Sequence, residues 1–176
     1  RRASAMLLQR RLPLWFMAMA VNRVAAKYAN VWARWHWGRR KEDERPLPDI
    51  LLHRLPVLPY WVPELFMLAA VARAFTDRDR LAQFLAVTTP AMLFRALVIC
   101  TTFYPTPLLC PPHWGYGAND LMFSGHTVML FAAARARWEY VVAALGALSI
   151  IAARHHYTSD VVVAVGLVEL LKRVVK

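Results

Sequence analysis

The sequence predicts an all-α integral membrane protein, a bundle of six transmembrane helices that forms one domain over residues 1–176. Hydrophobic residues make up 59% of the chain, and the mean hydropathy is +0.34, which is high for a soluble globular protein. The apolar residues lie in long blocks, and basic residues flank these blocks. Because cations at the ends of apolar helices suit lipid headgroups, this pattern favours a membrane protein.

The formal net charge of +11 does not indicate nucleic-acid binding, because the basic residues form no single stripe and no nucleic-acid motif is present. The chain has two cysteines, Cys100 and Cys110. Two are too few for a disulfide framework, and their spacing does not match that of zinc ligands. We therefore interpret both as free thiols.

The first helix is predicted over residues 12–32, after a basic N-terminal flank at residues 1–11. Asn22, Arg23 and Lys27 interrupt its apolar pattern, so its lower half is expected to face other helices or the headgroup zone. Residues 33–58 follow as a charged and proline-rich first loop, since prolines prevent a regular helix there.

The second helix is predicted over residues 60–76, with Tyr60 and Trp61 as anchors at the membrane interface. The third covers residues 81–104 and is long enough to span a bilayer. It carries Arg95 well inside. A charge at that depth usually faces the bundle interior and is a functional candidate, whereas the plainer alternative is an arginine that extends to the interface.

Residues 105–121 are rich in proline, glycine and aromatic residues and are expected to form a structured outer loop. Three further helices are predicted over residues 122–134, 140–154 and 157–175. The fourth and fifth helices are shorter than the roughly 20 residues that a span needs. They either thin the bilayer or place their ends below the headgroup plane.

Six crossings would place loop 105–121 and the turn at residues 154–158 on the same side of the membrane. The loop contains no lysine or arginine, so the positive-inside rule places it outside. Loop 33–58 would lie on that side too, and its basic residues contradict this placement.

Two motifs carry the candidate chemistry, Ser-Gly-His-Thr at residues 124–127 and His-Tyr-Thr-Ser-Asp at residues 156–160. His156 and Asp160 are four residues apart and share one face of a helix. The Asp160 carboxylate can accept a hydrogen bond from the Nδ1–H of His156, which fixes the tautomer and leaves Nε2 as a nucleophile.

In the first motif, Gly125 is expected to form a tight turn that places His126 at a helix start, where free backbone N–H groups suit a phosphate. Phosphoryl transfer through histidine needs a nucleophile, an acid and positive charge. His156 fits the first role and His126 the second. Arg95 and Arg154 supply positive charge, with hydroxyl donors from Ser124 and Thr127. The residues thus predict one His–His–Asp site for phosphoryl chemistry on a lipid.

Two alternatives stay open. Single histidines at helix ends are often capping or interface residues, and His155 is expected to be a loop residue because it does not share a face with Asp160. A divalent metal could instead bind His126, His156, Asp160 and Asp120, although no His-x-x-x-His or Glu-x-x-His pair supports such a site. We therefore expect neither a metal nor another cofactor.

The sequence resembles the sphingomyelin synthase family over about residues 45–170. The likeness lies in RPLPD at residues 45–49, FR at 94–95, DLMFSGHTVML at 120–130 and HYTSDV at 156–161. The resemblance implies a six-helix membrane enzyme with an outward-facing or lumenal site. Such enzymes move phosphocholine from phosphatidylcholine to ceramide and release diacylglycerol; relatives make ceramide phosphoethanolamine or inositol phosphorylceramide.

By likeness to the wider type-2 phosphatidic acid phosphatase superfamily, His156 would be the nucleophile, Asp160 its orienting base and His126 the proton donor, with no metal or cofactor. The expected substrate-binding residues are Arg95, Asp120, Ser124, Gly125, Thr127, Tyr157, Asp49 and Arg154. The chain departs from the family at Ala118 and Asn119, and it lacks the superfamily's basic motifs, with Ile150 at one of their positions.

Three functions follow from these residues: a lipid headgroup transferase, a lipid phosphatase or phospholipase C that uses water, and a non-catalytic lipid-binding protein. The expected partners are the membrane and its lipids, with no nucleic acid, and the sequence leaves open whether the chain forms a homo-oligomer. The expected location is the Golgi or plasma membrane in a eukaryote, or the inner membrane in a bacterium, with the site facing the lumen or exterior.

Overall fold

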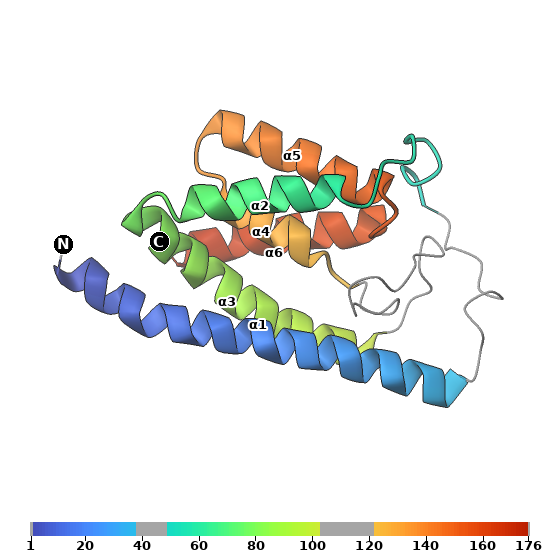
Figure 1. Ribbon diagram of the computed structural model, residues 1–176, viewed down its shortest axis with the longest axis horizontal. Coiled ribbons are helices and arrows are strands. Elements are labelled where there is room, and N and C mark those ends of the chain that lie inside the picture. The colour runs from blue at the N-terminus through green and yellow to red at the C-terminus, as the bar shows by residue number, and fades with distance from the viewer. Residues whose placement is uncertain (1, 38–48, 103–121, 176) are drawn as a thin grey trace.

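The computed structural model describes residues 2–37, 49–102 and 122–175, and within these ranges it contains helices and turns but no strand (Figure 1). The helices are α1 (Arg2–Trp37), α2 (Val62–Ala74), α3 (Arg78–Thr101), α4 (Gly125–Ala133), α5 (Arg137–Ala152) and α6 (Thr158–Val174). This confirms the all-α prediction. Each predicted helix overlaps one of these six.

The largest error in the sequence prediction concerns α1, which begins at Arg2 instead of residue 12 and continues to Trp37. The predicted basic flank and the start of the predicted first loop are therefore helical. Leu, Ala, Arg and Gln are good helix formers, and α1 lies along α3 over much of its length (Figure 1). The Arg11 guanidinium secures this pairing by donating to the carbonyl of Ala82 at 2.9 Å.

Helix α4 lies at the centre of the bundle and contacts α2, α3, α5 and α6. Every residue from Thr127 to Ala133 is buried. A helix that is apolar on all sides must be buried by its neighbours, which explains why this short segment carries no charged side chain after His126.

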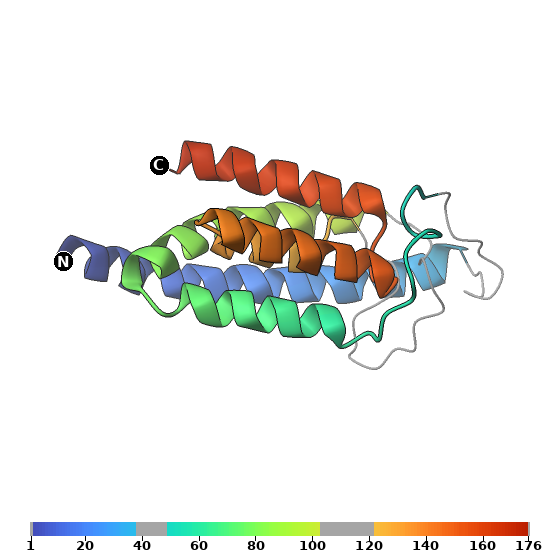
Figure 2. The same ribbon diagram turned by 90° about the horizontal axis from the view of Figure 1, so that it is seen from above.

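The helices alternate in direction, so the N-terminal ends of α2, α4 and α6 lie at the same end of the bundle (Figure 1, Figure 2). Both histidine motifs stand at this end, one at the start of α4 and the other at the start of α6. The turns that follow α2 and α4 lie at the opposite end.

Large apolar side chains also cover the outside of the bundle. Exposed examples occur on α1, α3, α5 and α6 and include Phe16, Val24, Phe94, Leu97, Trp138, Leu145, Val162 and Leu170. Among the helices of the described ranges, α3 alone is long and apolar enough to cross a membrane by itself. An apolar surface of this extent marks contact with lipid or with another protein.

Close packing of α5 generates one stability prediction. A Cβ added at Gly146 would lie 3.1 Å from Cβ of Phe66 on α2 and 2.9 Å from Cδ1 of Leu130 on α4. We expect Gly146→Val to lower the free energy of unfolding by about 2 kcal/mol through overpacking. Gly166→Val is the matched control, because an added Cβ there meets no atom within 4 Å. Thermal unfolding in detergent, followed by circular dichroism, measures both, and equal effects of the two variants would contradict this packing.

Candidate active site

The structure brings the two histidine motifs together at the starts of α4 and α6. The backbone N–H of Ser124 donates to the carbonyl of Asp160 at 3.3 Å. Ser124 also caps the N-terminus of α4, because its hydroxyl accepts a hydrogen bond from the N–H of Thr127 at 3.2 Å. Ser124, two residues before His126, is thus joined directly to the first turn of α6.

His156 and Asp160 face each other as their spacing suggests. His156 Nδ1 lies 3.4 Å from Asp160 Oδ2, and the residues are 5% and 2% exposed. The same Oδ2 accepts a hydrogen bond from the backbone N–H of Tyr157 at 3.1 Å. The helix start therefore fixes the carboxylate, and the carboxylate favours the imidazole tautomer with its proton on Nδ1. Nε2 is then the basic nitrogen.

Asp49 fixes the start of α6 from the first loop. Its carboxylate accepts hydrogen bonds from the N–H and the hydroxyl of Thr158, at 2.6 and 2.5 Å, and from the N–H groups of Leu51 and Leu52. Burial alone would raise the pKa of the Asp49 carboxyl, but these hydrogen bonds, that of the Thr158 hydroxyl foremost, lower it below its ordinary 3.8. Both carboxylate oxygens accept hydrogen bonds from the protein, so Asp49 positions the second motif.

His126 has a partner that the sequence analysis missed. Its Nε2 lies 2.9 Å from Oε1 of Glu64, in the first turn of α2. Glu64 is the one acidic residue in the predicted second helix, and a charge in an apolar segment is a functional signal that could have identified it. With Nε2 held by Glu64, Nδ1 is the nitrogen of His126 that can act on a substrate.

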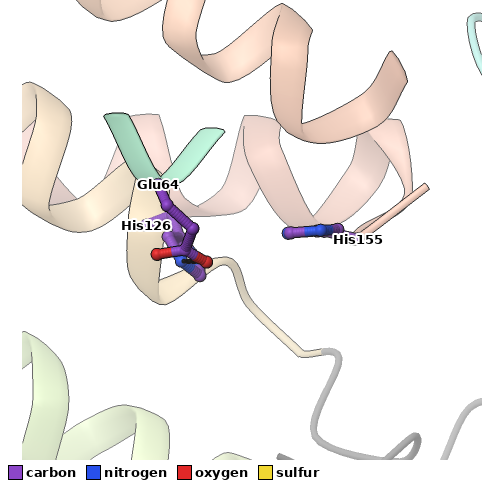
Figure 3. A group of neighbouring side chains, drawn as sticks. All are labelled: Glu64, His126 and His155. Carbon is purple, nitrogen blue, oxygen red and sulfur yellow. Dashed lines mark hydrogen bonds and ion pairs between the residues drawn. The ribbon is translucent and has the colours of Figure 1, made fainter. Parts of the chain in front are cut away.

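His155 lies in the turn between α5 and α6, as expected of a loop residue, and is partly buried against His126. The two ring centroids are 6.0 Å apart, and Figure 3 shows the His155 ring directed toward the Glu64–His126 pair. Burial, followed by the nearby His126 and His156, lowers the pKa of His155 to about 4. Its imidazole is therefore neutral at pH 7.

The turn that carries His155 and His156 depends on an unusual backbone conformation at Arg154, whose φ is 62°. The N–H of His155 donates to the carbonyl of Ile150, and the N–H of Arg154 donates to the carbonyl of Ile151. These two bonds form a Schellman motif at the end of α5, and its left-handed position is usually occupied by glycine. Arg154 Nη2 donates to the carbonyl of Leu55 at 3.2 Å. Its Nη1 is buried and has no hydrogen-bond partner among the described residues.

Arg95 is buried in α3 and faces the bundle interior. Its Nε donates to the carbonyl of Phe123 at 2.6 Å, and its Nη1 donates to Oδ1 of Asn22 on α1 at 3.0 Å. Its charge lies beside the first motif, since a Cβ added at Gly125 would lie 3.5 Å from Nε of Arg95.

The tight turn expected at Gly125 is wrong. Gly125 is the first residue of α4 and does not have a left-handed φ.

The remaining predicted residues divide into two groups. Thr127 and Tyr157 are buried next to the two histidines, and Thr127 Oγ1 has no hydrogen-bond partner within the described ranges. Asp120 and loop 105–121 lie outside the described residues. Of the alternative metal set, His156 and Asp160 contact each other, with 3.4 Å between Nδ1 and Oδ2.

Comparison with known families agrees with this site. Residues 117–175, which contain both motifs, match the family described as PAP2 superfamily C-terminal. The match supports a relation to the type-2 phosphatidic acid phosphatase superfamily. It thereby supports an enzyme that acts on lipids, as a phosphatase or a phosphotransferase.

The Asp49 contacts generate a pH prediction. Because the pKa is lower in the folded state, the stabilisation by Asp49 is fully present above pH 3.8 and is lost as the pH falls below it. We expect Asp49→Asn to cost about 1 kcal/mol at pH 6, since the amide nitrogen cannot accept from Thr158. This deficit should shrink at pH 3. Unfolding of both proteins at the two pH values checks this, and an equal deficit at both would contradict it.

Proposed function

We propose that the protein is a membrane phosphotransferase that moves a phosphoalcohol headgroup, foremost phosphocholine, from a glycerophospholipid to ceramide, giving sphingomyelin and diacylglycerol. The observation that carries the proposal is the contact of the His156–Asp160 pair with the start of α4, made by Ser124 two residues before His126. The PAP2 match supports the lipid-directed chemistry, and the resemblance to sphingomyelin synthases supports the choice of donor and acceptor.

In the first step, Nε2 of His156 attacks the phosphorus of phosphatidylcholine and forms a P–N bond. The bond between phosphorus and the glycerol oxygen breaks, and diacylglycerol leaves. His126, protonated at the start, gives the Nδ1 proton to this oxygen, so that no free alkoxide forms. Asp160 holds the Nδ1 proton of His156 and stabilises the positive charge that develops on the ring.

In the second step, the primary hydroxyl of ceramide attacks the same phosphorus. His126, now neutral, accepts the hydroxyl proton at Nδ1, and the P–N bond to His156 breaks. Sphingomyelin leaves, and both histidines return to their initial protonation states. The acid of the first step is the base of the second, so the His126 ring must keep one orientation, and the contact of its Nε2 with Oε1 of Glu64 fixes that orientation.

Positive charge for the phosphate oxygens comes from the buried Arg95, the partly buried Arg154 and a helix start. Arg95 stands beside Gly125, and Nη1 of Arg154 has the donor capacity that a phosphate oxygen would use. The N–H groups in the first turn of α4 add the positive end of the helix dipole. We assign Ser124, Gly125, Thr127, Tyr157 and Asp120 to the walls of this phosphate site, and Asp49 to holding its α6 side.

The helices are proposed to span the membrane six times, with the site toward the lumen or exterior. The apolar outer faces of α1, α3, α5 and α6 support this arrangement, because lipid tails can cover them. A lipid phosphate can then reach the site from the bilayer while its acyl chains stay in hydrocarbon.

A second candidate function uses the same residues with water in place of ceramide, which makes a lipid phosphatase or a phospholipase C. The PAP2 match favours it, because that superfamily includes phosphatases. Purified protein with headgroup-labelled phosphatidylcholine, with and without ceramide, separates the two. Label in sphingomyelin supports the transferase, free phosphocholine supports the phospholipase C, and no turnover would refute these two.

We expect His156→Ala to abolish turnover while the protein still folds and binds lipid, because it removes the imidazole that Asp160 orients as the nucleophile. Ser159→Ala is the matched control, since Ser159 is exposed in the same motif and should retain full activity. The headgroup assay measures both variants. Substantial turnover by His156→Ala would refute the nucleophile assignment.

We expect Asp160→Asn to lower the rate by about three to four orders of magnitude, because an amide can stabilise the wrong imidazole tautomer. The stability of this variant is measured alongside, since the side chain also accepts from Tyr157. A rate loss of less than about tenfold in a folded variant would count against the pairing.

A further inference from the structure

Three side chains from three separate elements converge beside the proposed site. Glu64 comes from α2, His126 from α4 and His155 from the α5–α6 turn (Figure 3). One ligand atom from each lies within 4.8 Å of the other two. His155 has no part in the reaction proposed above, and its neutral ring faces a carboxylate and a second imidazole.

This donor set matches the preference of zinc. Two imidazole nitrogens and one carboxylate oxygen suit Zn²⁺ at distances of about 2.0–2.2 Å, and a fourth position stays open for water. Tetrahedral bonds of that length separate the ligand atoms by about 3.4 Å. Glu64 Oε1 and His126 Nε2 are already 2.9 Å apart, and their side chains are 45% and 25% exposed, so movements of about 1 Å can bring all three donors onto one ion.

We propose that Glu64, His126 and His155 form a binding site for a divalent cation of the zinc class, and that the bound cation inhibits the enzyme. The binding claim stands on the three side chains alone, whereas the inhibition rests on the proposed function. An imidazole coordinated through Nε2 cannot also carry the second ring proton. His126 then no longer forms the imidazolium that protonates the leaving oxygen.

The binding arm uses purified protein without an affinity tag, titrated with Co²⁺ and with Zn²⁺. We expect one tetrahedral cobalt site per chain, visible in the absorption spectrum, and displacement of cobalt by zinc. His155→Asn should weaken binding by about tenfold or more, since it removes one of three ligands. His53→Asn is the matched control, because His53 is exposed and should leave binding unchanged. Mg²⁺ should not compete, since it prefers oxygen ligands.

Absence of cobalt binding by the wild-type protein, or equal binding by His155→Asn, would overturn the site. The activity arm is separate. We expect Zn²⁺ to inhibit wild-type turnover and a chelator to restore it, while His155→Asn turns over normally and needs at least about tenfold more zinc for the same inhibition. Cobalt binding with uninhibited turnover would overturn the inhibition alone. Binding without any turnover would refute the proposed function and leave the site intact.

Discussion

The hydrogen bond between the Ser124 N–H and the Asp160 carbonyl is the contact on which the site depends. It joins two helix starts inside an apolar bundle, where every polar group needs a partner. The neighbouring contacts follow from the same need. Asp49 accepts a hydrogen bond from the N–H of Thr158 at the start of α6, and the Ser124 hydroxyl accepts one from the first turn of α4. Arg95 donates a hydrogen bond to the carbonyl of Phe123. Each of these polar groups would destabilise the bundle if it were buried without a partner. Together they form a connected network, and the histidines lie at its edge.

The opposite end of the bundle carries a second, separate polar network, which is centred on Glu139. Glu139, at the start of α5, accepts from the backbone N–H groups of Arg135 and Ala136 and pairs with Arg80 and Arg73. Through these contacts one buried carboxylate joins α2, α3 and α5. The apolar interior between the two networks contains α4, which carries His126 at one end. A helix packed on all sides can hold the side chain at its end with little movement.

Local pattern predicted the helices and one half of the site. Apolar blocks located all six helices, and the four-residue spacing of His156 and Asp160 predicted their pairing. The partners that come from distant segments were not predictable: Glu64 lies 62 residues from His126, and Asp49 lies 109 residues from Thr158. Only packing brings such pairs together. The length of α1 was missed for a similar reason, since its pairing with α3 extends a helix that Pro13 and nearby charges would otherwise interrupt.

The most direct test of the central claim, that His156 is the nucleophile of a site built from both motifs, is to trap the covalent intermediate. The protein is mixed with phosphatidylcholine without an acceptor, denatured within milliseconds to seconds under alkaline conditions that preserve phosphohistidine, and digested for mass spectrometry. The account predicts phosphocholine attached to His156, and its disappearance when ceramide is added before denaturation. Phosphocholine on another residue, or rapid turnover with no adduct at any time, would contradict it.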